Sequence, residues 1–203
     1  PSNHDIFAAA WPLFSPDGRW IAFWHAYEGG ALCFVRADGT GYRKDLDFGG
    51  KPQLWRADGS ALVYVSLKDE LTPRGLYQCA PEGKPVELTS GEILDFDLAP
   101  TGAAVWLAPA ERQGETVKSV RVHERGFNGS SDAGWSHVLP GAYGEVRLSP
   151  QGTQVAVFVA DDSGQGKLYC GPWKGELQVV ADPATQLLGW AQGVLSAASG
   201  GTP

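Results

Sequence analysis

The chain has 203 residues, of which 43% are hydrophobic and 19% charged, so its composition is that of a globular protein that buries a core and not of a disordered one. Its formal net charge of −7 and pI near 5.0 argue against a nucleic-acid binder, which needs a basic surface. No apolar run reaches the roughly 18 residues that a membrane-spanning helix needs.

Five related segments follow one another along the chain. In order they read WPLFSPDG-RWIAFW, PQLWRADG-SALVYVS, DFDLAPTG-AAVWLA, EVRLSPQG-TQVAVFVA and QLLGWAQG-VLSAAS. Each combines an apolar run, a turn that ends in glycine and a second apolar run. The turn glycines are 41 to 50 residues apart, at Gly18, Gly59, Gly102, Gly152 and Gly193. A period near 40 residues with several short strands is typical of β-propeller blades, each a four-stranded antiparallel sheet.

The residues around each turn predict a hairpin, because Asp-Gly between two apolar runs favours a tight turn with positive φ. The third and fifth residues after each of the first four turns are apolar. We expect these pairs on one sheet face, against a neighbouring blade: Ile21 and Phe23, Leu62 and Tyr64, Val105 and Leu107, Val155 and Val157. A third and a short fourth strand complete these four repeats. Two stacked sandwich sheets would not explain why the same four-part order repeats in register.

We therefore predict an all-β fold, a single propeller domain over residues 1–203. Its repeats cover about 10–50, 51–91, 92–141 and 142–182, with a partial fifth repeat at 183–199 that lacks its third and fourth strands. An open propeller exposes two sheet edges, so closure needs an explanation. The N-terminal residues His4–Ala9 are a candidate for a missing strand of the last blade. A thin fifth blade, or a larger ring completed by another segment or copy, are the alternatives.

Two features of composition add expectations about processing and thiols. The chain contains no Met, even at position 1, which indicates a processed protein or an excised domain from which any targeting segment has been lost. Cys33, Cys79 and Cys170 match no zinc or redox spacing and fall on the same strand of different blades. We expect them to be buried free thiols.

A search for catalytic chemistry finds no GxSxG elbow, HExxH motif, Walker loop or GxGxxG after a strand. The four histidines are scattered, and the adjacent Asp161 and Asp162 do not make a calcium shell of six oxygens. We expect no cofactor and no metal. The missing motifs favour a protein that is not an enzyme.

A charged cluster is predicted where the first strands of the blades line the central channel. Alignment on the turn glycines places Asp95 and Glu145 in one column, and Asp97 and Arg147 in a second column two residues later. We expect these four side chains to converge, with Arg147 paired to Asp97, because a buried carboxylate needs a partner. A channel site for a cation or a polar peptide end and a salt-bridged channel wall are both compatible with this cluster.

The loops between the second and third strands are a second candidate surface. They are predicted at 25–30, 68–74, 108–116 and 161–166, all on one face of the propeller, and polar variable loops on a rigid scaffold often bind partners. The candidate contact residues are His25, Tyr27, Asp69, Arg74, Asp161 and Asp162. Trp135, at the end of the long connection 126–134 on the opposite face, is a further candidate. Ordinary surface polarity explains such loops equally well.

The repeats FSPDGRWIAFW, LCFVRADGT, LSPQGTQVAVFV and ADGSALVYVS resemble the WD40-like repeat of the TolB propeller family, over about residues 11–199. The second turn departs from the family pattern, with Arg56-Ala57 in place of Ser-Pro. Relatives include periplasmic TolB, which binds a peptidoglycan-associated lipoprotein, and the propeller domains that gate prolyl-oligopeptidase-type peptidases. Others are extracytoplasmic sensor domains.

The resemblance implies a bacterial, periplasmic or extracytoplasmic domain. Together with the missing catalytic motifs, it favours a non-catalytic binding domain that recognises a protein or peptide through the loop face or the channel mouth. Two alternatives remain: a propeller domain of a larger peptidase or other enzyme, and a sensor of a small ligand or carbohydrate, suggested by the aromatic residues.

Overall fold

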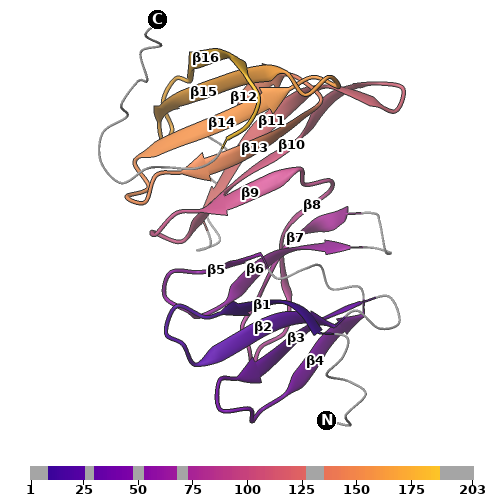
Figure 1. The fold of residues 1–203 in the computed structure, drawn as a ribbon, viewed down its shortest axis with the longest axis vertical. Helices are drawn as coiled ribbons and strands as arrows, with labels where there is room; N and C mark the ends of the chain where they lie inside the picture. The colour runs from indigo at the N-terminus through magenta and orange to yellow at the C-terminus, as the bar shows by residue number, and fades with distance from the viewer. Residues whose placement is uncertain (1–8, 26–29, 48–52, 68–72, 127–134, 188–203) are drawn as a thin grey trace, which may run out of the picture.

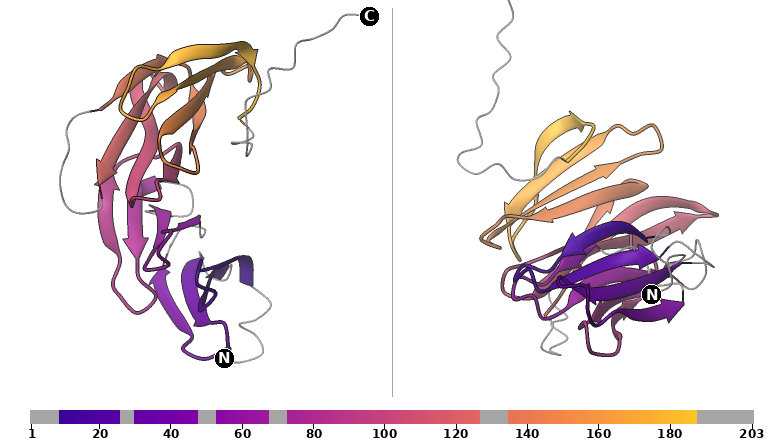
Figure 2. Two further views of the ribbon diagram at one scale, coloured as in Figure 1. Left: turned by 90° about the vertical axis from the view of Figure 1, so that its left-hand side faces the viewer. Right: turned by 60° about the horizontal axis from the view of Figure 1, so that its bottom comes forward.

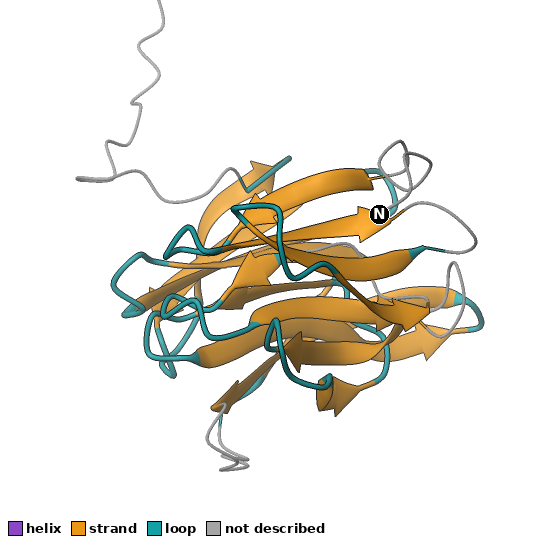
Figure 3. Cartoon of the chain, turned by 90° about the horizontal axis from the view of Figure 1, so that it is seen from below, coloured by secondary structure: helices purple, strands orange, loops and turns teal. Residues whose placement is uncertain are grey.

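A computed structural model describes residues 9–25, 30–47, 53–67, 73–126 and 135–187. In these ranges the chain forms sixteen strands and no helix, and short loops join the strands (Figure 3). The strands make four sheets of four antiparallel strands, hydrogen-bonded in chain order, which we call blades 1 to 4 (Figure 1). The predicted all-β propeller of four-stranded blades is confirmed.

The strand bounds follow the repeats. Blade 1 consists of β1 (Ala9–Phe14), β2 (Trp20–His25), β3 (Ala31–Arg36) and β4 (Arg43–Asp47). Blade 2 consists of β5 (Leu54–Trp55), β6 (Leu62–Leu67), β7 (Pro73–Cys79) and β8 (Val86–Ser90). Blade 3 consists of β9 (Asp95–Leu98), β10 (Ala103–Gln113), β11 (Thr116–Gly126) and β12 (His137–Pro140). Blade 4 consists of β13 (Tyr143–Leu148), β14 (Gln154–Ala160), β15 (Gly166–Pro172) and β16 (Gln178–Ala184).

The hairpins between the first two strands share the same glycine hydrogen bond in all four blades. Each turn glycine donates its N–H to the carbonyl three residues earlier, as Gly18 does to Ser15 (2.8 Å) and Gly152 to Ser149 (2.7 Å). Its φ lies between +66° and +83° in all four turns, a conformation that costs glycine little and other residues much. The repeated glycine therefore sets the turn of every blade.

Apolar clusters fill the three spaces between successive blades. We call the face of a blade that points toward the preceding blade its incoming face, and the other its outgoing face. Blades 1 and 2 are joined by Ala22, Leu32, Phe34, Trp55, Leu62 and Tyr64. Blades 2 and 3 are joined by Val63, Leu76, Phe96, Ala104 and Trp106. Blades 3 and 4 are joined by Val105, Leu107, Val120, Val122, Val146, Val155 and Val157.

In blade 3 the predicted pair of the second strand shares one face against a neighbouring blade, as expected, but that neighbour is the following blade and not the preceding one. Val105 and Leu107 belong to the outgoing face, against blade 4, while Ala104 and Trp106 take the incoming face. The reason is a turn one residue shorter: Ala99 N–H bonds Ala103 O, whereas the corresponding bond in blade 4 runs from Ser149 to Gln154. Because neighbouring strand residues point to opposite faces, one missing residue reverses the whole strand.

The predicted loop 108–116 of blade 3 is also wrong. β10 and β11 continue to Gln113 and Thr116, which pair across a two-residue turn with Gly114 at φ +61°. This segment is thus an extended hairpin and not a polar loop. The other long connection of blade 3, residues 127–134, lies outside the described residues.

The cysteines lie in the third strands of blades 1, 2 and 4, as expected. All three are free thiols. Cys33 and Cys79 are buried, but Cys170 is only half-buried, so the expectation of burial was wrong for that residue.

The four blades follow one another along an arc, with blades 1 and 4 at its two ends (Figure 2). The predicted fifth repeat lies outside the described residues from position 188 onward, as does the proposed N-terminal latch up to residue 8. Ala9, the last residue of that latch, instead pairs with His25 and so belongs to the first strand of blade 1.

Candidate functional site

The first strands of three blades meet at a hollow of about 310 Å³, which we call the inner hollow. It is lined by Gln53, Leu54, Asp95, Phe96, Asp97 and Arg147. These residues come from, or directly precede, the first strands β5, β9 and β13. Three of the four residues predicted for the channel cluster are therefore together at the inner edge of blades 2 to 4.

Asp95 and Asp97 face blade 4 because they are two residues apart on β9. The carboxylate of Asp95 accepts a hydrogen bond from the N–H of Val146 (2.8 Å), and that of Asp97 accepts one from the N–H of Leu148 (2.7 Å). A first strand pairs with a neighbour on one side only, so its other edge presents unpaired backbone groups. The two carboxylates satisfy that edge of β13 across the space between the blades.

Arg147 forms an ion pair with Asp95, whereas the predicted partner was Asp97. Its Nη1 lies 2.5 Å from Asp95 Oδ2 and also donates to the carbonyl of Val146. The Arg147 and Asp95 side chains are 36% and 23% exposed, so the ion pair lies at the surface of the hollow. A ligand in the hollow would therefore meet a guanidinium and a carboxylate side by side.

Asp97 is the more buried of the two acids. Burial raises the pKa of its carboxyl, and the hydrogen bonds from the Leu148 and Leu98 N–H groups oppose that rise without cancelling it. Both oxygens of Asp97 are used within the domain, one for each N–H. Asp97 is therefore a structural group behind the hollow, and Asp95 with Arg147 forms its polar surface.

Glu145 is not among the residues that line the inner hollow. It lies on β13 opposite Phe158 of β14, a residue of the apolar cluster on the outgoing face of blade 4. Directly opposite residues of an antiparallel pair share a face, so Glu145 points away from blade 3. Arg147 starts from the same face, opposite Ala156, but its side chain reaches Asp95, so Glu145 is the one member of the predicted cluster that does not line the inner hollow.

Of the loop-face candidates, the structure describes His25, Arg74, Asp161 and Asp162. His25 ends β2 and is 5% exposed, so it is a buried residue and not a solvated loop residue. Arg74 lies in β7, with its guanidinium 5.5 Å from the ring centroid of Tyr77. Tyr27 and Asp69 lie outside the described residues.

Asp161 and Asp162 follow β14 and line a hollow of about 330 Å³ together with Lys118 and Lys167. Asp161 Oδ1 accepts hydrogen bonds from the N–H and the hydroxyl of Ser163, and these bonds lower the pKa of its carboxyl. Asp161 therefore shapes its own loop. Within the described ranges, no three His, Cys, Asp or Glu side chains are grouped as ligands of a metal ion.

Trp135 is directed into the domain. Its indole N–H donates to the carbonyl of Gly175 in blade 4 (2.9 Å), and its ring meets that of His137 edge-on at 5.1 Å. It also packs against the cluster between blades 3 and 4. These contacts show that Trp135 packs between blades 3 and 4, which explains why an aromatic residue is found at this position.

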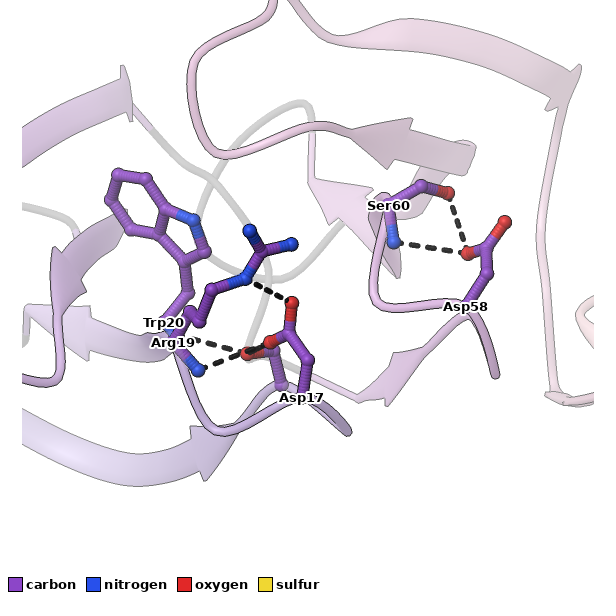
Figure 4. A network of polar contacts seen from close by, with 6 residues as sticks. Asp17, Arg19, Trp20, Asp58 and Ser60 are labelled. Atoms are coloured by element: carbon purple, nitrogen blue, oxygen red, sulfur yellow. Dashed lines mark hydrogen bonds and ion pairs between the residues drawn. The ribbon is translucent and has the colours of Figure 1, made fainter.

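Another hollow, of about 730 Å³, lies between the turns of blades 1 and 2 and was missed by sequence reasoning. The guanidinium of Arg36 stacks over the Trp20 ring at 5.1 Å and pairs with Glu82 of blade 2 at 2.7 Å. Nearby, Asp17 accepts hydrogen bonds from the backbone and side chain of Arg19 (Figure 4).

A repeated sequence feature, an aspartate in the turns, occurs beside that hollow. An aspartate that accepts from the residue two positions later recurs in the turns at Asp17, Asp38, Asp58 and Asp161, and the bond from Ser60 to Asp58 is visible in Figure 4. Such bonds lower the pKa of all four carboxyls. The Asp-Gly pattern was interpreted only as a turn, although three of these turns, those of Asp17, Asp38 and Asp58, border the hollow.

The fold is similar to that of several solved propeller structures. TolB from Acinetobacter baumannii matches with a TM-score of 0.57 and 17% identity, over 86% of this chain and 43% of that one. A putative TolB from Agrobacterium tumefaciens matches with a TM-score of 0.57 and 17% identity, over 83% and 63%. The β-propeller domain of the Trilobed protease from Pyrococcus furiosus matches with a TM-score of 0.55 and 16% identity, over 85% and 58%.

The chain is a β-propeller of four-stranded antiparallel blades. Its fold is TolB-like, and it spans between two fifths and two thirds of the two TolB chains it matches. No protein-family model and no curated protein matches the sequence. None of the described residues belongs to a helix that is long and apolar enough to cross a membrane.

Proposed function

We propose that this chain is a non-catalytic binding domain that recognises a protein or peptide partner at the inner hollow. The observation that carries the proposal is the Asp95–Arg147 pair, which is partly exposed at the meeting point of three first strands. Arg147 supplies donors and Asp95 an acceptor on a rigid sheet scaffold, an arrangement suited to a polar peptide segment.

The TolB-like fold supports the proposal, because the family resemblance of the repeats implies binding of a protein partner. The same resemblance is the basis for proposing a periplasmic or other extracytoplasmic location. Of the predicted contact surfaces, the channel side is favoured over the loop face. The reason is that the loop candidates His25, Arg74 and Asp161 are buried or engaged in local contacts.

The test is retention of proteins from an extract of the source cell on the immobilised, folded chain. We expect a partner at micromolar concentration whose retention falls at least about tenfold with Arg147→Met, a loss typical of an interfacial charged hydrogen bond. Arg112→Met is the matched control, because Arg112 also pairs with a carboxylate, that of Glu92, but far along the β10–β11 hairpin.

Two results would count against the proposal. Retention of no protein by the folded chain would contradict partner binding. Equal retention by the wild type and Arg147→Met would leave the chain a binding domain but remove the inner hollow as its site.

A second candidate is a propeller domain of a larger peptidase. The likeness to the propeller domain of the Trilobed protease favours it, as that solved chain is itself a domain of a protease. The reading frame on either side of these 203 residues decides between the candidates. A hydrolase domain there would support the peptidase, and its absence from the complete gene would exclude it.

A further inference from the structure

The turns of blades 1 and 2 enclose the hollow of about 730 Å³, which we call the turn hollow. Because the strands of each blade alternate in direction, the turns between first and second strands lie on the same face as those between third and fourth strands. This face is opposite to the loops between second and third strands. The turn hollow and the inner hollow have no lining residue in common, so they are separate surfaces of the domain.

Contacts between the two blades hold the walls of the turn hollow in place. From β4 of blade 1, Arg43 donates to the carbonyls of Pro81 (2.9 Å) and Gly83 (2.5 Å) in a turn of blade 2. Gly59, in another turn of blade 2, is buried, and a Cβ at that glycine would lie 3.4 Å from the carboxyl carbon of Asp17. The hollow is therefore a fixed feature of the packed blades.

The corresponding turns of blades 3 and 4 meet through apolar groups. Pro100 packs so closely on Gly152 that a Cβ at that glycine would lie 3.2 Å from Pro100 Cδ. The turns of blades 3 and 4 read APTG and SPQG and carry no charge, whereas those of blades 1 and 2 read SPDG and RADG. Stacking of blades does not itself require charged turns, so the charged hollow is a particular feature of the first two blades.

Two arginines supply hydrogen-bond donors to the turn hollow. The guanidinium of Arg36 lies 5.1 Å from the centroid of the Trp20 ring, and its Nη2 pairs with Glu82. Arg19 donates from Nε to Asp17, and within the described ranges its Nη1 and Nη2 have no partner. The Arg19 side chain is 78% exposed, and Figure 4 shows its guanidinium directed toward the turn of blade 2. The free donors of Arg19 are therefore open to a ligand.

The acidic side chains near the hollow are already engaged as acceptors. Asp17 uses both carboxylate oxygens, and Asp38 uses Oδ1, for hydrogen bonds within their own turns. Glu82 accepts from Arg36, but the two side chains are 71% and 50% exposed, and an exposed ion pair contributes little to stability. The carboxylate of Glu82 can therefore be displaced from Arg36 by the carboxylate of a ligand.

We propose that the turn hollow binds an acidic peptide segment, with one carboxylate on the Nη atoms of Arg19 and a second on Arg36 in place of Glu82. A guanidinium binds a carboxylate through two parallel hydrogen bonds, and the stack on Trp20 already orients Arg36 for this contact. A volume of about 730 Å³ suits a ligand larger than a single small anion. Two acidic side chains on one extended segment meet both requirements.

The test is calorimetric titration of the folded chain with the peptide acetyl-Gly-Glu-Gly-Glu-Gly-amide. We expect a dissociation constant of about a millimolar or below, raised at least about tenfold when glutamine replaces both glutamates of the peptide. Arg19→Gln should weaken binding about tenfold, because the charged donors are lost. Glu82→Gln should strengthen binding about threefold, because the group that competes for Arg36 loses its charge.

Matched controls are available on the β10–β11 hairpin. Arg112→Gln and Glu115→Gln make the same changes of charge at exposed positions away from the turn hollow, and both should bind the peptide like the wild type. Absence of binding by the wild type, or equal binding by Arg19→Gln, would overturn the proposal. An affinity of Glu82→Gln at or below that of the wild type would contradict the displacement of Glu82.

Two further titrations separate the alternatives. Glutarate carries two carboxylates without a peptide backbone, so binding of glutarate as tight as that of the peptide would assign the hollow to free organic acids and overturn the peptide ligand. Arg147→Met should bind the peptide like the wild type. If Arg147→Met loses the peptide and Arg19→Gln retains it, the peptide binds at the inner hollow, which contradicts a site at the turns and supports the proposed function.

Discussion

The first strand of each blade has unpaired backbone groups at the inner edge of its sheet. Blades 1 and 2 satisfy these groups with a different kind of side chain from blades 3 and 4. At the first pair the indole N–H of Trp55 donates to the carbonyl of Leu13 at 3.1 Å. At the second pair the carboxylates of Asp95 and Asp97 accept from the N–H groups of β13. In both places a side chain of one blade satisfies the free backbone edge of its neighbour.

The difference between the two pairs explains where a polar site is found. A buried indole leaves an apolar inner edge, and Leu13 and Leu54 occupy the column that holds Asp97 and Arg147 in the later blades. The carboxylates of Asp95 and Asp97 are negatively charged, and Arg147 at the surface of the hollow balances this charge through its ion pair with Asp95. The same architectural need thus places the charged side chains of the candidate binding site at the inner edges of blades 3 and 4.

The largest expected effect comes from removing the more buried carboxylate. Asp97→Ala leaves the N–H groups of Leu98 and Leu148 without their acceptor, which should lower the free energy of unfolding by about 1–3 kcal/mol. Chemical denaturation measures the change. Asp162→Ala, at an exposed position, is the control and should stay within about 0.5 kcal/mol of wild type. An equal effect of the two substitutions would remove Asp97 from the inter-blade contact.

The corresponding change at the apolar pair should cost less. Trp55→Phe keeps most of the ring but removes the donor to the Leu13 carbonyl, a loss of about 0.5–1.5 kcal/mol in the free energy of unfolding. The same denaturation experiment applies. A loss larger than that of Asp97→Ala would reverse the ranking and show that the indole, not the carboxylates, is the stronger link between blades.

A smaller effect is expected in the pH dependence of stability. Burial raises the pKa of Asp97, so its contribution to stability is fully present below the ordinary carboxyl pKa and is lost as the pH rises through the raised pKa. The wild type should therefore gain stability relative to Asp97→Asn as the pH is lowered through that window. Denaturation of both proteins across the acid range checks the sign. A relative gain on raising the pH would contradict burial as the dominant cause.

The smallest effect concerns an exposed turn of blade 1, outside both inner edges. Hydrogen bonds from Ser15 and Arg19 lower the pKa of Asp17 to about 2, from an ordinary value of 3.8. Titration followed by NMR should show this midpoint, and Ser15→Ala should move it back toward 3.8, since the hydroxyl of Ser15 is the largest cause. An unchanged midpoint in the variant would assign the shift to Arg19 instead.

The parts of the fold that were predictable are those that depend on near neighbours in the chain. The turn glycines, the four-strand order of each blade and the position of Asp95, Asp97 and Arg147 on first strands all follow from spacing within one repeat. The hollow between the turns of blades 1 and 2 was missed because its residues come from two repeats, and no spacing within either one joins Arg36 to Glu82.

Two features depended on contacts between blades. Alignment on the turn glycines does not show which neighbouring blade a sheet face meets: the turn of blade 3 is one residue shorter, so Val105 and Leu107 face blade 4, whereas Val155 and Val157 of blade 4 face blade 3. The ion pair between Arg147 and Asp95 was not predicted either. Both carboxylates accept a backbone N–H of β13, and column alignment does not show which of them also lies beside the guanidinium.

The sequence alone determined that this protein is a propeller of repeated four-stranded blades, because each blade is specified by a local pattern of turns and alternating residues. Only the tertiary structure decided which residues meet between blades, because those contacts depend on the relative position of sheets about 40 residues apart in the chain. The candidate binding site is a property of that stacking.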